Sequence, residues 1–252
     1  MASNFKNLFK NKKTLIGMIH LAGSNPTRKI ERAVKEIKML QDGGFDGALV
    51  ENYCGSTSDV LNTLYEVNKL KNESSIPIGV NILPNNFVES FEFAGKYCSF
   101  IQLDYISGKY RVASGVYEFG DEQMKQYLSL KVKYPNIVVL GGVWPKYYTP
   151  VEDSNLVDDI YTATERADAV VVTGKATGIE TPIQNIKSFR EILGSDFPLI
   201  VGAGLNKFNF EEQMRIADGA IIGTNIKENI LDIQTPIDLK KVKYFTTLAR
   251  SL

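Results

Sequence analysis

The sequence predicts a single (β/α)8 barrel, and three observations support this prediction. Short apolar runs rich in β-branched residues alternate with amphipathic stretches along the 252 residues. About eight such repeats of roughly 30 residues fill the chain, as a barrel of this kind requires. The G-x-G-x-x-G fingerprint that opens a dinucleotide-binding fold is absent. We therefore expect one domain over residues 1–252, with residues 1–13 as a short capping segment.

Composition and charge exclude several classes of protein. Lys plus Arg and Asp plus Glu number 29 each, so no net charge attracts the chain to nucleic acid or to an anionic membrane. Cys54 and Cys98 match neither a disulfide framework nor a zinc site, which is typical of a reducing compartment. The chain has no apolar run long enough to span a bilayer and no apolar signal core. We therefore expect a cytoplasmic protein without an integral membrane segment.

The first half of the chain begins with a basic amphipathic stretch. Residues 3–13 place Phe5, Leu8 and Phe9 at helical spacing between lysines. A helix that closes the bottom of the barrel and a helix that lies on a membrane surface both fit this pattern. The strands expected next are residues 14–20, 45–50, 76–83 and 99–103, and the helices are 26–40, 57–70 and about 87–94.

The second half contains one stretch without periodicity. Residues 105–117 mix glycine, serine and aromatic residues, so they form either a lid over the active face or a plain surface insertion. We expect Thr181 to cap a helix that ends at Gly194, and Asn206 to open the helix after that. The strands expected here are 137–140, 169–173, 199–201 and 220–222; the helices are 124–132, 156–167, 182–193, 208–217, a short extra helix over 225–231 and a final one over 238–248.

Glycines follow the last three predicted strands. In barrels of this class, phosphate is frequently held by the loops after the seventh and eighth strands and by the start of a short extra helix. The alternative is that these glycines only make tight turns. The residues that we expect to bind a small phosphorylated ligand are Asn52, Asn81, Thr173, Gly174, Thr177, Gly202, Ala203, Gly204, Gly223 and Thr224.

Four further side chains near strand ends are candidates for catalysis: His20, Glu51, Asp104 and Lys146. Two carboxylates on separate strands could share acid and base work beside the carbonyl of a phosphosugar, or could only hydrogen-bond ligand hydroxyls. Lys146 could form a Schiff base or contact the substrate or its phosphate. The histidine and the carboxylates could also gather a divalent metal, although no local spacing marks a metal site and we expect no other cofactor.

The motifs together resemble the BtpA/SgcQ family. They are GMIHL around His20, GGFDGALVEN ending in Glu51 and Asn52, VVTGKATG from residue 171, VGAG from residue 201 and ADGAIIGTNIK from residue 217. The resemblance spans residues 17–245 and implies a phosphate-binding (β/α)8 barrel. The family is named for a cyanobacterial member required for photosystem I accumulation, and many members are presumed enzymes whose substrates are unsettled.

The chain departs from the family pattern at the mouth of the barrel. Gln102-Leu103-Asp104 stands where members tend to have Arg-x-Asn, and Gly142 and Tyr147 stand where they commonly have aspartate and histidine. These changes would alter or remove the chemistry if the lost residues hold a metal or a proton. The resemblance leaves two classes of function open: an isomerase, epimerase or lyase that acts on a small sugar or pentose phosphate, and a non-catalytic assembly factor for a membrane complex. Barrels of this kind often form homodimers, but no stretch of the sequence marks an interface.

Overall fold

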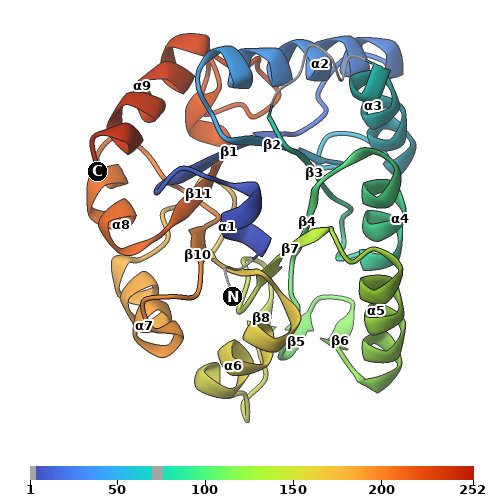
Figure 1. Ribbon diagram of the computed structural model, residues 1–252, viewed down its shortest axis with the longest axis vertical. Helices are drawn as coiled ribbons and strands as arrows, with labels where there is room; N and C mark the ends of the chain where they lie inside the picture. The colour runs from blue at the N-terminus through green and yellow to red at the C-terminus, as the bar shows by residue number, and fades with distance from the viewer. Residues whose placement is uncertain (1–3, 70–75) are drawn as a thin grey trace.

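The structure is a computed structural model that describes residues 4–69 and 76–252. Eight parallel strands form a closed barrel in the order β1-β11-β10-β9-β7-β4-β3-β2 (Figure 1). The predicted (β/α)8 barrel is therefore confirmed. The strands are β1 (Thr14–Ile19), β2 (Gly47–Glu51), β3 (Ile78–Asn81), β4 (Phe100–Leu103), β7 (Val138–Gly142), β9 (Ala169–Val172), β10 (Leu199–Val201) and β11 (Gly219–Ile222).

Helices surround the barrel and cover its outer face (Figure 1). Their apolar faces pack on the outward side chains of the strands and form a continuous hydrophobic core. Parallel strands need this cover, because both faces of a parallel sheet are buried. None of the helices among the described residues is long and apolar enough to cross a membrane. They are α2 (Pro26–Asp42), α3 (Thr57–Lys69), α4 (Phe87–Tyr97), α5 (Asp121–Lys133), α6 (Leu156–Arg166), α7 (Ile183–Leu193), α8 (Phe210–Ile216) and α9 (Leu239–Arg250).

The inside of the barrel holds a second core. Successive side chains of a strand point to opposite faces, so Leu15 of β1 packs against the helices while Ile16 packs inside. The short N-terminal helix α1 (Asn4–Leu8) lies at the end of the barrel where the strands begin, and Phe5 and Phe9 are buried in the inner core. This favours the closing helix over a membrane-surface helix, because both aromatic rings are already covered.

The segment between β4 and α5 is more regular than the sequence predicted. It forms a hairpin of β5 (Lys109–Val112) and β6 (Gly115–Glu118), and β8 (Thr149–Pro150) pairs with β5. The expectation of irregular structure was wrong here, because strands of four residues with one fully buried side chain, Tyr110, are too short to show a period. Residues 109–118 do not line the barrel cavity, which favours the plain surface insertion over the lid.

The predicted short extra helix is also wrong. Only one 3-10 turn, η1 (Thr224–Ile226), follows β11. The chain then turns back on itself, and Lys227 and Ile237 form an antiparallel bridge. The side chain of Lys227 is buried and pairs with Glu36 of α2.

Two helix starts differ from the prediction as well. Thr181 caps no helix, because its Oγ1 donates to the carbonyl oxygen of Ala203 at 3.0 Å. Asn206 accepts the N–H of Phe208 in a turn at 2.9 Å, so α8 begins two residues later than expected. The amphipathic stretch expected over residues 3–13 begins at residue 3, and the helix expected over 57–70 ends at residue 70. Both of these end residues lie outside the described residues.

Candidate functional site

The strand period of two brings polar residues into the mouth of the barrel. On β1 the inward Met18 is followed two positions later by His20, and on β2 the inward Leu49 is followed by Glu51. The other strands continue in the same way, so the apolar filling ends in a ring of polar or small residues at the carboxyl ends. This ring consists of His20, Glu51, Asn81, Asp104, Thr173, Gly202 and Gly223.

One cavity lies at this ring, and the ring residues that line it are His20, Glu51, Gly202 and Gly223. The cavity encloses about 410 Å³, including open solvent at its mouth. Glu51 lies on one side of the cavity, while residues 202–204 and 223–225 lie on the other. The cavity therefore has a carboxylate side and a glycine side.

The glycine side presents backbone N–H groups. Those of Ala203, Gly204 and Gly223 donate to no described residue, which leaves them available to a bound anion. Gly204 has a φ of +67°, and a Cβ at this position would lie 2.1 Å from the carbonyl oxygen of Ile179. Only glycine fits there. Successive free N–H groups in such turns can form a concave site for an anion.

On the carboxylate side, Asn81 joins two acidic residues. Its Nδ2 donates to Glu51 Oε2 at 2.9 Å and more weakly to Asp104 Oδ1 at 3.4 Å. Burial raises the pKa of both carboxyls. The pKa of Glu51 rises to about 7, because burial and the charge of Asp104 outweigh the opposing charge of Lys146 and the Asn81 hydrogen bond. Asn81 therefore links two buried carboxyls, and burial disfavours the charged form of each.

His20 is a neutral member of the site. Its side chain is buried, and burial, together with the positive charges of Lys227 and Lys146, lowers its pKa to about 3. The ring packs edge-on against Tyr53 with centroids 5.6 Å apart. Nδ1 has no hydrogen-bond partner among the described residues. His20 can therefore hydrogen-bond a ligand but supplies no positive charge.

Lys146 is the one positively charged side chain among the described residues that line the cavity. Its backbone N–H donates to Thr173 Oγ1 at 2.8 Å, which fixes the turn after β7 to the end of β9. A lysine in this place can contact a phosphate or an oxygen of the substrate on which negative charge develops.

The remaining predicted residues divide between the cavity and its supports. Thr177 and Thr224 line the cavity, whereas Gly174 lies behind it, close to the backbone of Glu180. Asn52 does not face the cavity as expected: its Oδ1 accepts the N–H of Leu83 at 2.8 Å and its Nδ2 donates to the Leu83 carbonyl at 3.2 Å. Asn52 directly follows the inward Glu51, so the strand period turns it outward.

Three residues at the mouth had not been predicted as functional. Gln102 is inward on β4, and its Oε1 is buried without a partner among the described residues. The strand period would have identified it. Tyr147 Oη accepts the N–H of Thr177 at 2.9 Å, and Tyr53 covers His20. These two tyrosines come from loops after different strands, so no local pattern identifies them.

Gly142, where the family commonly has aspartate, is in close contact with β4. A Cβ at Gly142 would lie 1.8 Å from the carbonyl oxygen of Asp104. No side chain fits there in this protein. Asp104 thus provides the carboxylate at this side of the mouth, from the neighbouring strand.

The described residues contain no cluster of three His, Cys, Asp or Glu side chains arranged to hold a metal ion. The proposed set of His20, Glu51 and Asp104 is not assembled as ligands, because the amide N–H groups of Asn81 face both carboxylates.

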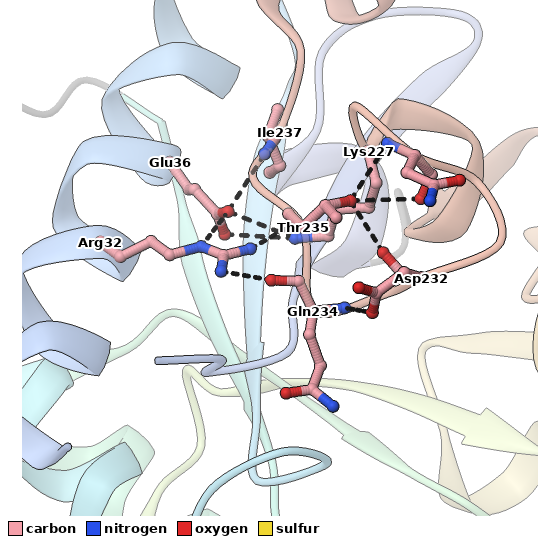
Figure 2. A network of polar contacts seen from close by, with 8 residues as sticks. Arg32, Glu36, Lys227, Asp232, Gln234, Thr235 and Ile237 are labelled. Carbon is pink, nitrogen blue, oxygen red and sulfur yellow. Dashed lines mark hydrogen bonds and ion pairs between the residues drawn. The ribbon is translucent and has the colours of Figure 1, made fainter. Parts of the chain in front are cut away.

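A buried ion pair supports the glycine side from behind. Figure 2 shows Lys227 Nζ facing Glu36 of α2, at 3.3 Å from Oε2. Glu36 also accepts from Arg32 Nε at 2.8 Å and from the N–H of Ile237 at 3.1 Å. The Arg32 guanidinium in turn donates to the carbonyls of residues 234 and 235 (Figure 2). This network ties the loop that follows Gly223 and η1 to α2.

Fold and site together define a (β/α)8 barrel whose mouth joins a glycine side with free backbone N–H groups to two buried carboxyls. The chain belongs to the BtpA family, whose model matches residues 11–251. An uncharacterised protein of Pyrococcus furiosus is 30% identical, with 98% of both chains aligned. The photosystem I biogenesis protein BtpA of Synechocystis sp. is 25% identical over 91% of this chain and 86% of that protein. The resemblance seen in the motifs is confirmed.

Solved structures share the barrel at low sequence identity. Thiamine phosphate pyrophosphorylase from Pyrococcus furiosus matches with a TM-score of 0.63 and 12% identity, covering 96% of this chain and 98% of that one. The N-acetylmannosamine-6-phosphate 2-epimerase from Clostridium perfringens matches with a TM-score of 0.56 and 15% identity, covering 87% and 88%. At these identities the likeness shows the fold alone.

Proposed function

We propose that this protein is an enzyme that binds a small phosphorylated metabolite and transfers a proton within it, in isomerase, epimerase or lyase chemistry. The observation that supports this most is Glu51, whose pKa of about 7 accompanies a turn with free backbone N–H groups in the same cavity. Binding a phosphate group would require only the glycine side, so the buried carboxyl needs another explanation. A buried carboxyl that titrates near neutral pH is suited to take and return a proton.

The geometry suggests a role for each group. The phosphate accepts hydrogen bonds from the N–H groups of residues 203, 204 and 223. Ionised Glu51 removes a proton from a carbon beside a carbonyl, and Lys146 stabilises the negative charge that develops on the oxygen. Neutral His20 donates a hydrogen bond to the same oxygen or to a neighbouring hydroxyl. Burial raises the pKa of Glu51, and the charge of Asp104 adds to this rise.

Two of the structural neighbours have names that include a phosphate ester, which agrees with this assignment. The relative named for photosystem I biogenesis suggests the other class, a non-catalytic assembly factor for a membrane complex. We place the enzyme first, because burying two carboxyls lowers stability and a binding module has no need of them.

A thermal-shift screen of the purified protein against sugar phosphates, pentose phosphates, nucleotides, inorganic phosphate and divalent metals tests the proposal. A ligand at about 100 times its Kd stabilises by about 2.7 kcal/mol, which raises the midpoint of a chain of this size by about 5–11 °C. Lys146→Met should reduce the shift. Lys175→Met is the matched control, because Lys175 is exposed on a neighbouring loop and does not line the cavity.

With a ligand identified, Glu51→Gln should still bind it and should turn it over at least a hundred-fold more slowly. Gly204 is a poor position for this test, since any side chain there collides with the backbone of Ile179 and disturbs folding. Failure of every phosphate compound to stabilise the wild-type protein would remove the basis of the enzyme assignment, and a search for a protein partner would follow.

A further inference from the structure

We propose that Trp144 is a positioning residue: its indole, anchored on Asp159, holds the strained turn that presents Lys146 to the cavity. The inference rests on the proposed function, because it takes Lys146 and Glu51 as working groups of the site.

The turn after β7 contains two strained residues. Trp144 has a φ of +48° and Tyr147 a φ of +69°, so left-handed residues lie on both sides of Lys146. The N–H of Tyr148 donates to the carbonyl of Pro145 at 3.2 Å, which makes residues 145–148 a four-residue turn. Tyr147 is its third residue, where a positive φ normally requires glycine. Bulky residues keep such conformations only where the surroundings hold them.

The surroundings of Trp144 supply that support. Its Nε1 donates to Asp159 Oδ2 of α6 at 2.9 Å, and its backbone N–H donates to Tyr110 Oη of β5 at 3.1 Å. Tyr110 Oη donates to the carbonyl of Ser107 at 2.8 Å, and Ser107 Oγ donates to the carbonyl of Asp159 at 2.7 Å. Trp144 is therefore fixed by a chain of hydrogen bonds outside the cavity.

The other end of the turn is fixed to the loop after β9. The N–H of Lys146 donates to Thr173 Oγ1 at 2.8 Å, and Tyr147 Oη accepts the N–H of Thr177 at 2.9 Å. Because the backbone is held on both sides of Lys146, the direction of its side chain is set by the turn.

The direction of Lys146 matters to the ionisable groups of Glu51, Asp104 and His20. Its positive charge is the largest charge effect opposing the burial of Glu51, and it also acts on Asp104 and His20. If the turn relaxed, Lys146 could move out into solvent, and the pKa of Glu51 would rise further. The hairpin thus supports the site through Tyr110, which accepts the N–H of Trp144, although the hairpin does not line the cavity.

A titration of Glu51 without ligand tests the inference. Protein labelled with [5-13C]glutamate gives carboxyl signals by NMR, and Glu51→Gln identifies the signal of Glu51 by its loss. Asp159→Leu removes the acceptor for the indole at similar size, whereas Asp159→Asn keeps an acceptor. Trp144→Phe removes the donor. Tyr161→Phe, at an exposed position on the same helix, is the control.

We expect the titration midpoint of Glu51 to rise in Asp159→Leu and in Trp144→Phe, in the direction of the rise seen in Lys146→Met. It should stay at the wild-type value in Asp159→Asn and in Tyr161→Phe. Trp144 is the one tryptophan of the chain, so its fluorescence reports directly whether the turn has moved.

Three results would overturn the inference. One is a red-shifted Trp144 emission in Asp159→Leu with the Glu51 midpoint unchanged. Another is an equal rise in Asp159→Asn and Asp159→Leu, since the acceptor would then be irrelevant. The third is a Lys146→Met variant that titrates like the wild type. Because no ligand is used, a negative thermal-shift screen would leave this result standing, and the failure of either proposal can be told from that of the other.

Discussion

Replacing Glu51 by glutamine should stabilise the protein at neutral and alkaline pH while it removes the proposed proton-transfer group. Glu51 is 5% exposed, and its pKa is about 7 compared with 4.5 for the free side chain. Glutamine keeps an oxygen that accepts the Nδ2 hydrogen of Asn81 and cannot ionise. The variant therefore removes the titration and preserves the hydrogen bond.

The sign of the effect follows from proton binding. As the pH rises from about 4.5 to about 7, the unfolded chain releases the Glu51 proton while the folded chain keeps it. The folded state binds more protons in this window, so its stability falls as the pH rises, and the loss is complete above the folded pKa. One pKa unit corresponds to ~1.36 kcal/mol, so ionising buried Glu51 costs the folded state about 3 kcal/mol. Well below the unfolded pKa the carboxyl is protonated in both states and costs nothing.

Urea unfolding of the wild type and of Glu51→Gln across a pH series measures this difference. We expect the variant to gain stability relative to the wild type through the window and to remain about 3 kcal/mol more stable above it. Glu66→Gln on α3 is the control, because the Glu66 side chain is 43% exposed. A difference between Glu51→Gln and the wild type that does not change with pH would show that the folded protein ionises Glu51 freely. The acid-base part of the proposed function would then lose its support.

Two further predictions concern the structure behind the glycine side. Lys227→Met should cost about 3 kcal/mol, because Glu36 keeps its other partners. Glu36→Leu should cost about 5 kcal/mol, because Lys227 then loses the one side-chain partner that it has among the described residues. The double variant should lose less than the sum of the two. Additive losses in urea unfolding would mean that the buried pair in Figure 2 is not coupled. Gly204→Ala should lower the thermal midpoint far more than Gly194→Ala, since both have positive φ but only Gly204 faces the backbone of Ile179. Equal losses would show that φ alone accounts for the cost, which is about 1–2 kcal/mol.

The barrel could be predicted from the sequence because most of its elements are periodic over enough residues to show a buried face. The helix expected over residues 26–40, for example, spans Pro26–Asp42. The predictions of secondary structure failed where a strand is too short to show a period, or where a tertiary contact prevents the element that the local sequence favours. The hairpin of residues 109–118 has strands of only four residues. The helix expected over 225–231 does not form, because Lys227 is buried against Glu36 and the chain turns back toward α2.

The site could be predicted in part for the same reason. His20, Glu51, Asn81 and Asp104 were expected at strand ends, and the structure brings all four to the mouth. Asn52 was grouped with them because it also follows a strand, but its position one residue after an inward side chain turns it toward Leu83. A position at the end of a strand therefore does not by itself show that a side chain faces the cavity; the alternation of side chains along the strand must also point it inward.

The sequence by itself determined which stretches form the barrel strands and that glycines follow the last three, since both depend on residues close together in the chain. Tertiary structure alone decided the charges and contacts at the mouth. The pKa of Glu51 depends on burial and on Lys146 and Asp104 from other strands. The conformation of the turn around Trp144 depends on Asp159 of a helix and Tyr110 of an inserted hairpin. These effects arise from groups that only the closed barrel brings together, because electrostatic and hydrogen-bond partners act through space and not along the chain.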